Sequence, residues 1–422
     1  LSRGGRRCAF PSSSNGLEKR PKLRFPGFDE PWCSHKFSAV FSFLQNNTLS
    51  RAELDATGDV LDIHYGDVLI KYGSILDATD NTIPHIISGH ESTNYDYLQD
   101  GDIIVADTAE DKTVGKTIEL LNISGRKIEA GLHTVPCRPL FPFASMYLGY
   151  YMNTPHYHKQ LIPLMQGIKV LSISKGNISK TEISSPQTIA EQEKISRFLY
   201  LLDQRAAAQS KIIDAIKKYK RGLLNKLFSN INSNIYPTVY LSEVADFLQG
   251  LTYSPSDVSV SGYLVLRSSN IQNGMLSFDD CVYVDKKVDE SLQVKCDDVI
   301  MCVRNGSKNL VGKTALIPPN MPMTTWGAFM MIIRSKLNDT YIFHYLNSQM
   351  FFSQVFKDTG TATINQITKG ILNECRLPLP PETERKQISK MLSSFDAKIQ
   401  NAEKCLATLV NLKKALLQQL FI

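Results

Sequence analysis

Two long segments of this 422-residue chain share a strict hydrophobic period, and this feature constrains the fold more than any other. In residues 191–228 the apolar positions alternate steps of four and three residues, and residues 384–421 repeat the pattern. Aligned at a shift of 193 residues, the two segments are identical at 11 of 38 positions. A period sustained over about five heptads is typical of a coiled-coil seam. We therefore predict two helices, each roughly 57 Å long, that pack on each other.

The expected seam positions are apolar apart from one charged position, which Lys220 and Lys413 occupy in the two segments. We interpret this pair as register markers or as contacts with other subunits. The lysines of KKYKR (217–221) either bind phosphates or an acidic partner, or are only solvated. The alternative of two helices that each lie on their own domain explains the strict period less well. The predicted apolar seam comprises Ile195, Leu199, Leu202, Ile213, Ile216, Leu223, Leu227, Ile388, Leu392, Phe395, Ile399, Leu406, Leu409, Leu416 and Leu420.

The sequence upstream of each long segment is also repeated, which indicates two homologous halves. DGDIIVA (100–106) matches CDDVIMC (296–302) at a shift of 196 residues, and VGKT occurs at both 114–117 and 311–314. The shift changes gradually along the chain, as expected when loops differ in length. Each half should therefore contain the same fold.

Each upstream region has the pattern of a mixed α/β domain of about 150 residues. Short apolar runs between Gly, Asn, Pro and Ser clusters predict strands at DIIVAD, HTVPCRPL, YLVLRSS, DVIMCVR and FMMIIRS. Helices are expected around 145–153 and 340–356. We predict a disordered basic N-terminus (1–20), a first domain (21–188), a central helix (189–230), a second domain (231–381) and a C-terminal helix (382–422).

The repeated VGKT resembles the end of a phosphate-binding P-loop, but its context excludes that interpretation. A P-loop needs a glycine five residues before its Gly-Lys pair, and this chain has Glu110 and Ser307 there. The following runs TIELL and TALIP have the pattern of strands, whereas a P-loop opens a helix. VGKT is therefore interpreted as a structural landmark of each half, and only measurable nucleotide turnover would revive a nucleotidase function.

Composition places the chain among ordinary globular proteins, with 43% hydrophobic and 21% charged residues. No apolar run reaches the roughly 18 residues of a membrane span. Eight scattered cysteines without a Cys-x-x-Cys pair favour a reducing, cytoplasmic location and argue against structural zinc. The net charge of +6 is concentrated in the N-terminal tail and the two long segments, which is unlike a simple DNA-binding protein with basic globular domains.

Enzyme motifs are missing from the sequence, so we expect a non-enzymatic protein without cofactor or metal. It contains no Gly-x-Gly-x-x-Gly, no nucleophile elbow and no Asn-Pro-Pro-aromatic or Asp-Pro-Pro-aromatic stretch of DNA methyltransferases. Acids such as Asp279 and Asp280 are adjacent, so on a strand they point to opposite faces. His156 and His158 have no carboxylate or cysteine at ligand spacing and are interpreted as a helix end.

Forked and amide side chains on loops are the groups that read base edges: Arg reads guanine, and Asn or Gln reads adenine. The loop RNGSKN (304–309) offers several, and DTAEDKT (107–113) is the matching loop of the first half. Such compositions are also common in ordinary surface turns. Our candidates for DNA contact are Arg304, Asn305, Lys308, Asn309, Thr108 and Lys112, and the weaker candidates are Tyr253, Arg267, Ser268, Asn270, Lys71 and Tyr72.

The ordered set of motifs, present twice, resembles the specificity subunits of type I restriction–modification systems. The resemblance covers essentially residues 21–422 and rests on PKLRFPGFDEPW (21–32), EQEKISRFLYLLDQR (191–205), RKQISKMLSSFDAKI (385–399) and the helix ends KRGLLNKLF and KKALLQQLF. GYLVLRSSNIQNG and the paired stretches that end in VGKT belong to the same pattern. The second helix departs from the family by beginning ETERKQI, without the usual Glu-Gln pair, and the first lacks the usual Leu-Pro before it.

The resemblance implies two target recognition domains, related by a pseudo-twofold axis and joined by an antiparallel coiled coil. Each domain would read one half of a split, asymmetric site in double-stranded DNA. The coiled coil would space the halves and dock two methyltransferase subunits, and restriction would require motor-nuclease subunits. Partners that enclose the duplex would also supply much of the phosphate neutralisation that the domains here lack. The alternative is a duplicated scaffold that binds proteins without reading DNA sequence.

Overall fold

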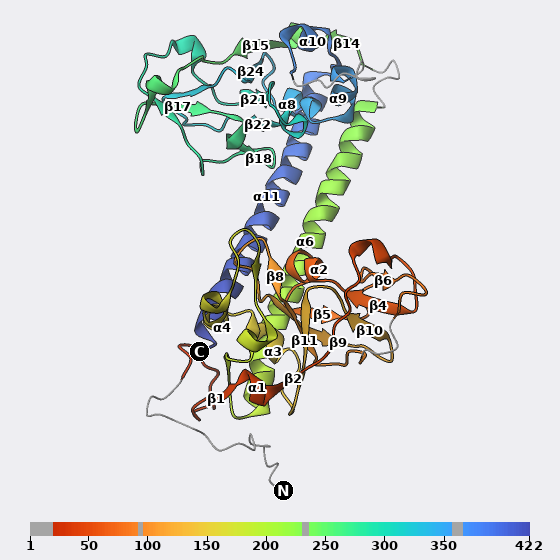
Figure 1. Cartoon of the computed structure of the whole chain (residues 1–422). Coiled ribbons are helices and arrows are strands. Elements are labelled where there is room, and N and C mark those ends of the chain that lie inside the picture. Colours follow the sequence, from red (N-terminus) through yellow and green to blue (C-terminus); the bar gives the residue numbers. More distant parts are fainter. Residues whose placement is uncertain (1–19, 92–95, 230–235, 357–365) are drawn as a thin grey trace. The chain divides into compact units, whose positions relative to one another are not determined.

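The computed structural model describes residues 20–91, 96–229, 236–356 and 366–422. The chain divides into two compact units, unit 1 (residues 1–209 and 405–422) and unit 2 (residues 210–404). Each unit contains one globular α/β part and portions of both long helices (Figure 1). The predicted mixed α/β class is confirmed. The predicted disordered segment 1–20 lies outside the described residues, apart from Arg20.

The described residues of unit 1 form two main sheets and two small ones. The larger sheet has the order β2 (Phe41–Phe43), β11 (Thr134–Pro139), β7 (Ile103–Ala106), β9 (Thr117–Leu121), β5 (Ile75–Asp77). The second has the order β10 (Lys127–Ala130), β4 (Val60–Ile63), β6 (His85–Ile86), β3 (Leu54–Asp55). The small sheets pair β1 (Cys33–Lys36) with β13 (Glu182–Ser185) and β8 (Thr108–Ala109) with β12 (Leu171–Ser172).

Unit 2 repeats this topology almost strand for strand. Its first sheet has the order β15 (Ala245–Gln249), β24 (Met330–Ser335), β21 (Val299–Cys302), β22 (Thr314–Leu316), without a counterpart of β5 among the described residues. Its second has the order β16 (Val258–Ser259), β20 (Tyr283–Val284), β17 (Tyr263–Leu266), β23 (Thr324–Trp326). Two further pairs join β14 (Thr238–Tyr240) to β25 (Arg376–Pro378) and β18 (Ile271–Gln272) to β19 (Met275–Leu276). The two halves are therefore homologous in fold.

Short helices flank the sheets in the same order in both units. The helix expected around 340–356 is divided in two, because the Ser348 hydroxyl accepts a hydrogen bond from Phe351 N at 3.3 Å and starts a new helix. Thr154 caps the equivalent helix in unit 1 by accepting from Tyr157 N at 3.2 Å. The helices are α1 (Phe37–Val40), α2 (Tyr65–Ile70), α3 (Tyr147–Met152), α4 (Pro155–Leu161) and α5 (Lys175–Ile178) in unit 1, and α7 (Leu241–Val244), α8 (Tyr341–Leu346), α9 (Gln349–Val355) and α10 (Lys369–Glu374) in unit 2.

A bidentate ion pair holds the larger sheet of each unit at the same place. In unit 1, Arg138 donates to Asp102 through Nε at 2.9 Å and Nη2 at 2.7 Å. In unit 2, Arg334 donates to Asp298 through the same two atoms at 2.8 and 2.7 Å. Both aspartates are buried. The two pairs are related by the same shift that relates DGDIIVA to CDDVIMC in the sequence.

The VGKT landmark lies between two neighbouring strands of the larger sheet, β7 and β9 in unit 1 and β21 and β22 in unit 2. Gly115 and Gly312 have φ values of 88° and 87°, a region that favours glycine. A Cβ atom on Gly115 would lie 2.3 Å from Leu161 Cδ1. The runs after VGKT are strands β9 and β22, as predicted. The lysine of the first copy donates to the backbone carbonyls of Leu69 and Tyr72, which is a structural role.

The two long helices, α6 (Ile189–Ser229) and α11 (Glu382–Gln419), pack against each other in antiparallel fashion. In unit 1 the start of α6, with Leu199, shares a core with Leu416 and Leu420 from the end of α11. In unit 2 the end of α6, with Leu224, shares a core with the start of α11, including Leu392. Every predicted apolar seam position is buried or partly buried. The coiled coil is confirmed, and both helices also pack on the globular parts.

A phenylalanine at or just after the end of each long helix is buried in a globular part. Phe421 lies 5.8 Å from Tyr147 and 6.0 Å from Tyr151, between ring centroids. Phe228, at the end of α6, lies 5.4 Å from Tyr341 in unit 2. Unit 1 is therefore completed by residues that follow unit 2 in the sequence.

The two seam lysines form ion pairs between the helices. Lys413 Nζ lies 2.6 and 2.7 Å from the carboxylate oxygens of Asp203, which also accepts from the Tyr150 hydroxyl at 2.8 Å. Lys220 forms the equivalent pair with Asp396. His344 replaces the tyrosine there, with Nδ1 4.0 Å from that carboxylate. These contacts favour the interpretation of the lysines as register markers.

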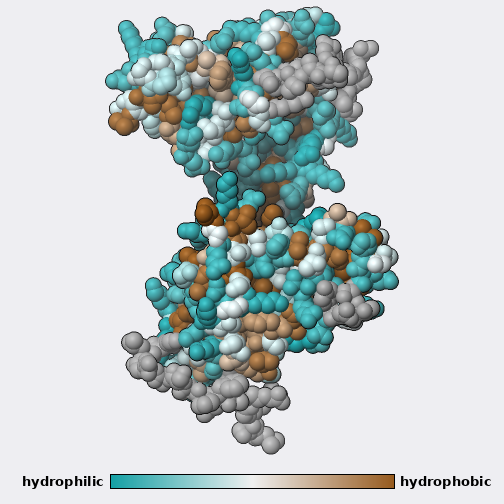
Figure 2. Space-filling model, viewed as in Figure 1, coloured by the Kyte–Doolittle hydropathy of each residue, from teal (hydrophilic) through white to brown (hydrophobic). Residues whose placement is uncertain are grey.

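Among the described residues, no helix is long and apolar enough to cross a membrane. The visible surface of each unit carries mainly hydrophilic residues with scattered hydrophobic ones (Figure 2).

Candidate nucleic-acid interface

A short turn joins the second sheet to the first in each unit, and its backbone is held in the same way in both. In unit 1 the turn Gly131–His133 connects β10 to β11, and in unit 2 the turn Gly327–Phe329 connects β23 to β24. Gly131 N donates to Ile63 O at 3.0 Å, and Gly327 N donates to Leu266 O at 3.0 Å. The first residue of both turns is therefore held by an equivalent backbone hydrogen bond to the second sheet.

The far end of each turn is fixed to the strand segment next to it. Asp107 N donates to the carbonyl of His133 at 3.1 Å, and Val303 N donates to the carbonyl of Phe329 at 3.0 Å. His133 and Phe329 thus occupy one structural position, and the next residues along, Thr108 and Arg304, occupy a second. We call each pair a turn tip: His133 with Thr108 in unit 1, and Phe329 with Arg304 in unit 2.

The turn tip of unit 2 combines an exposed aromatic ring with an arginine. Phe329 has 60% of its surface exposed, and the guanidinium carbon of Arg304 lies 5.5 Å from the ring centroid. Arg304 makes no ion pair with any residue that the structure describes. The adjacent Asn305 donates through Nδ2 to the hydroxyl of Ser268 at 3.1 Å. Loops far apart in the sequence therefore meet here.

A pocket of about 760 Å³ lies beside this turn tip. Phe329, Tyr253, Arg267 and Ser268 line it, together with apolar side chains such as Val258. Arg267 faces Asp280, with Nη2 to Oδ2 at 2.8 Å. Five predicted candidates, Tyr253, Arg267, Ser268, Arg304 and Asn305, thus gather on one surface of unit 2.

Two other candidates of unit 2 do not join this surface. Asn270 is fully buried, and its amide donates to the carbonyls of Ser277 and Asp280, both at 3.0 Å. Its expected contact with DNA is therefore corrected to a structural role. Asn309 is exposed and lines a different pocket with Phe352. The backbone of Lys308 begins the short 3-10 helix η7 (Lys308–Leu310), and its predicted contact with DNA stays a prediction.

The turn tip of unit 1 is polar and hydrogen-bonded. The Thr108 hydroxyl donates to Asp107 Oδ1 at 2.7 Å and lies 3.4 Å from His133 Nδ1. His133 also lies edge-on to Tyr65, with ring centroids 5.2 Å apart. His133 has φ 55°, a left-handed conformation that is costly for a residue with a side chain. The pKa of the neighbouring His64 is lowered by burial and then by the charge of Arg51.

The remaining candidates of unit 1 lie away from this tip. Tyr72 is only 5% exposed, and burial raises the pKa of its hydroxyl, so its predicted contact with DNA is corrected to a place in the core. Lys71 donates to the carbonyl of Thr82, and its ammonium lies 5.0 Å from the Tyr72 ring centroid. Lys112 is exposed in the loop that precedes VGKT. Of the unit 1 candidates, Thr108 alone belongs to the turn tip.

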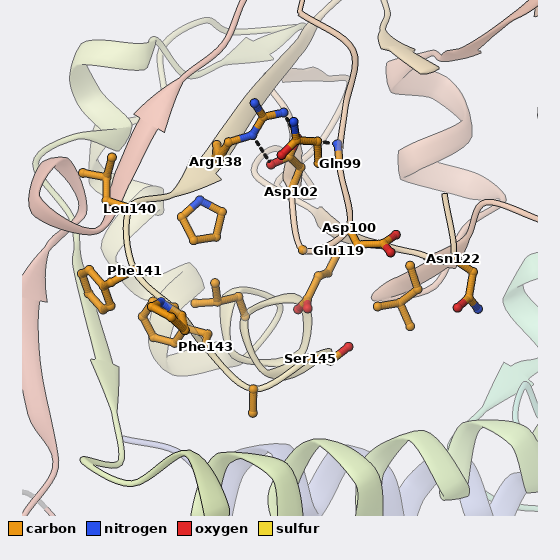
Figure 3. A pocket seen from close by; sticks show the side chains of 16 residues that line it. Gln99, Asp100, Asp102, Glu119, Asn122, Arg138, Leu140, Phe141, Phe143 and Ser145 are labelled. Carbon is orange, nitrogen blue, oxygen red and sulfur yellow. Dashed lines mark hydrogen bonds and ion pairs between the residues drawn. The ribbon is translucent and has the colours of Figure 1, made fainter. Parts of the chain in front are cut away.

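A second pocket, of about 590 Å³, lies in unit 1 and is drawn in Figure 3. Leu140, Phe141 and Phe143 supply apolar lining, and the Arg138–Asp102 pair also lines the pocket. Glu119 also lines it and accepts from the backbone N–H groups of Met146 and Gly149 at 2.5 and 2.8 Å. Burial raises the pKa of Glu119 to about 7. These charged groups are engaged in holding the fold, and the pocket contains no predicted DNA contact.

Unit 1 also contains a buried pair of acids. Asp62 and Glu129 are partners on the parallel strands β4 and β10, and Asn47 Nδ2 donates to both, at 2.8 and 3.1 Å. Burial raises the pKa of Asp62 to about 7. Among the described residues, no group of three His, Cys, Asp or Glu side chains is arranged to hold a metal ion.

Sequence reasoning missed His133 and Phe329, which lie at the centre of the two tips. A signal was present, because AGLHT (130–134) aligns with WGAFM (326–330) at the shift of 196 residues that relates the neighbouring strands. The shared glycine marks the turn, and the residue two positions later differs in chemistry. Comparing the two halves position by position would have selected both residues.

Comparison with known proteins shows which family part of this chain resembles. Residues 236–410 match the family model described as the type I restriction modification DNA specificity domain. The chain is 28% identical over 171 residues to the EcoKI type I restriction enzyme specificity subunit of Escherichia coli, a match that covers 39% of this chain and 36% of that protein. It is 28% identical over 176 residues to the StySPI specificity subunit of Salmonella potsdam, covering 40% and 38%. The matches thus span well under half the length of these relatives.

The fold is similar to solved structures along nearly the whole chain. A type I restriction–modification S subunit from M. genitalium has a TM-score of 0.57 at 14% identity, covering 95% of this chain and 99% of the other. A structure described in terms of complex assembly and conformational transition of the type I R-M system gives the same TM-score at 16% identity, with the same coverage. This chain therefore resembles type I restriction–modification specificity subunits, in sequence over part of its length and in fold over nearly all of it.

Proposed function

We propose that this chain is the DNA-sequence-recognition subunit of a type I restriction–modification complex. Each unit would read one half of a split, asymmetric site in double-stranded DNA. The coiled coil of α6 and α11 would set the spacing of the halves and dock methyltransferase subunits. The relatives named above support this function over a scaffold that does not read DNA sequence.

One observation carries the proposal: the same backbone frame presents different side chains in the two units. The two anchoring hydrogen bonds have nearly equal lengths in unit 1 and unit 2, at 3.0 and 3.0 Å for the first and at 3.1 and 3.0 Å for the second. The tips differ, with His133 and Thr108 in unit 1 and Phe329 and Arg304 in unit 2. Two half-sites of different sequence require equivalent positions with different chemistry.

The chain would act without catalysing a reaction itself. Two acids of unit 1, Asp62 and Glu119, have raised pKa values, but both are buried and hydrogen-bonded to other groups of the protein. A general acid or base must instead lie within hydrogen-bonding reach of its substrate. Methylation would come from two methyltransferase subunits, and cleavage from motor-nuclease subunits. These partners would also supply cationic contacts to the phosphates, which dominate affinity for DNA.

The test is selection of binding sites from a random duplex library at a stated salt concentration. The chain would be co-expressed with its candidate methyltransferase subunit and purified as the complex. We expect two short fixed sequences separated by a constant unspecified gap. Exchanging residues 231–381 for those of another family member should change only one of the two sequences. Binding that depends on salt but selects no sequence would contradict the proposal and favour a scaffold.

A further inference from the structure

The side chains of the unit 2 turn tip indicate which two neighbouring bases this unit recognises in DNA. This inference rests on the proposed function. Its starting point is Arg304. Other arginines of this unit are engaged: Arg334 is held by Asp298 at 2.7 Å and Arg267 by Asp280 at 2.8 Å. Arg304 has no such partner among the described residues and lies over the ring of Phe329.

Stacking on an aromatic ring orients the guanidinium group of an arginine without neutralising its positive charge, as a carboxylate would. The guanidinium keeps its N–H donors free at its edge while the ring contacts its face. Guanine is the base whose major-groove edge offers two acceptors, N7 and O6, to such a fork. The isolated β-bridge between Arg304 and Gln366 and the bond from Arg304 N to the carbonyl of Phe329 at 3.2 Å fix its backbone. The group is therefore pre-positioned to read one base.

Phe329 supplies the apolar half of the same tip. Its ring is 60% exposed although the turn beneath it is held by backbone hydrogen bonds, including Met330 N to Gly327 O at 2.8 Å. Gly250 allows the close approach of this turn, because a Cβ there would lie 2.2 Å from the carbonyl oxygen of Gly327. An apolar side chain in the major groove contacts the methyl group of thymine. Guanine and thymine side by side would therefore satisfy both residues.

Unit 1 lacks both groups at the equivalent positions. Thr108 replaces the arginine, and its hydroxyl is already hydrogen-bonded to Asp107 at 2.7 Å. His133 replaces the phenylalanine and lies 3.4 Å from the same carboxylate oxygen. This polar, acceptor-rich tip has no fork for guanine and no apolar ring for a methyl group.

We propose that the turn tips determine which bases the two units distinguish, with Arg304 and Phe329 selecting a guanine adjacent to a thymine in the half-site of unit 2. Arg304 reads guanine N7 and O6, and Phe329 contacts the thymine methyl. The tip of His133 and Thr108 accounts for a different base preference in the other half-site.

The experiment repeats the library selection with the purified complex and four variants of this chain. Arg304→Lys keeps the positive charge and removes the fork, so overall affinity should persist while the preference for guanine falls roughly 5- to 150-fold. Phe329→Ala should remove the preference for thymine over cytosine at the neighbouring position. In both variants the half-site of unit 1 should be unchanged.

The double variant Thr108→Arg with His133→Phe tests whether the tip alone carries the preference. In this double variant, the selected half-site that unit 1 reads should contain a guanine that the parental half-site lacks. Met323→Ala is the matched control, since Met323 is a 51% exposed apolar residue in another turn of unit 2 and should leave both half-sites as they are. Unfolding temperatures of all variants are measured alongside, and we expect them to equal that of the parent chain because none of the altered residues is buried in a core.

The outcomes separate the two proposals. If the parent complex selects no split sequence, the recognition function itself is wrong. If it does select one, and both Arg304→Lys and Phe329→Ala return the parental sequence, the assignment of the turn tip is wrong while recognition stands. Loss of selection in both half-sites with an unchanged unfolding temperature would also overturn the assignment, since it would indicate a general contact with DNA.

Discussion

Unit 1 and unit 2 hold the pairs Arg138–Asp102 and Arg334–Asp298 at almost identical distances, whereas at the turn tips His133 stands where unit 2 has Phe329. The pairs and the tips are related by one and the same shift along the sequence. The pairs lie at buried ends of strands and fix the sheet, whereas the tips face solvent. The two units thus share the buried ion pair that fixes the sheet and differ in the side chains exposed at the turn tip.

The interiors of the two units have also diverged, at positions that carry charge. Unit 1 buries Asp62 and Glu119, and the strand pairings put Val265 and Leu316 at the equivalent positions of unit 2. Unit 2 in turn buries His344 where unit 1 has Tyr150. The two units should therefore respond differently to pH.

Each unit contains one of the two tryptophans of the chain, so their stabilities can be measured separately. Trp32 is 5% exposed in unit 1, and Trp326 is fully buried in unit 2. In variants that retain one tryptophan, with the other changed to Phe, fluorescence during urea unfolding reports a single unit. Separate signals are needed because the two-state approximation applies to small single domains and often fails for chains with several domains.

Breaking the repeated ion pair should strongly lower the stability of the unit that contains it. Asp298→Ala leaves the Arg334 guanidinium partly buried without its carboxylate and should lower the free energy of unfolding of unit 2 by about 3 kcal/mol. Asp102→Ala should do the same to unit 1. Asp280→Ala is the control, since Asp280 is 62% exposed and its pair with Arg267 should contribute less than about 1 kcal/mol. An effect of Asp298→Ala seen equally at Trp32 would contradict the division into units.

The seam leucines test whether the coiled coil stabilises both units equally. Leu199 and Leu392 are equivalent in the alignment of the two long segments, and both are fully buried. Changing either to Ala should cost about 2–4 kcal/mol through lost burial and the cavity left behind. Leu199→Ala should act on the signal of Trp32 and Leu392→Ala on that of Trp326. Urea titration of the single-tryptophan chains measures both, and equal losses at both signals from one substitution would show that the units unfold together.

Changes of pH should affect the two units in opposite directions. The pKa of Asp62 and of Glu119 is raised by burial to about 7, so their contribution to the stability of unit 1 is present below about pH 4 and is lost as pH rises through 7. Burial lowers the pKa of His344 to about 3, so its contribution to unit 2 is present above about pH 6.5 and is lost as pH falls toward 3.

Urea unfolding at a series of pH values between 4 and 8 checks this contrast. The variants Asp62→Asn with Glu119→Gln, and separately His344→Tyr, should flatten the response of the unit that carries them. Parallel pH profiles at Trp32 and Trp326 would show that other groups dominate.

Of the groups considered, the seam lysines Lys220 and Lys413 should contribute least to the free energy of unfolding. Lys413→Met removes a partly exposed pair with Asp203 and should cost about 1 kcal/mol or less in unit 1. Lys220→Met should behave similarly in unit 2, although its carboxylate partner has His344 beside it rather than a tyrosine. A shift in helix register, detected by disulfide cross-linking of cysteines placed across the seam, would be the more informative result. An unchanged register in both variants would leave the apolar residues as its sole determinants.

Much of the fold could be predicted from the sequence because its signals are periodic and repeated. The seam positions, the strands around DIIVAD and DVIMCVR, and the homology of the halves all rest on patterns that packing enforces. The splitting of 340–356 could not be predicted in this way, since it depends on the single cap of Ser348.

The site was predicted less completely, for a physical reason. Arg304, Asn305 and Ser268 were selected from loop composition, and folding brings the last two within hydrogen-bonding distance. Composition alone treated Asn270 and Tyr72 as available, because the same polar groups serve base edges and buried backbone carbonyls equally well. Phe329 was overlooked because an isolated phenylalanine in a strand-like run is ordinarily a core residue.

The position of Phe421 has a consequence for how the protein is made. Most of unit 1 leaves the ribosome before unit 2, yet its core includes Leu416, Leu420 and Phe421. Unit 2 ends at Lys404, and the last residue of its main core is Leu392. At roughly 5–20 residues per second, synthesis of residues 210–404 holds unit 1 open for roughly 10 to 40 s. The half that is translated first is thus the half that is finished last.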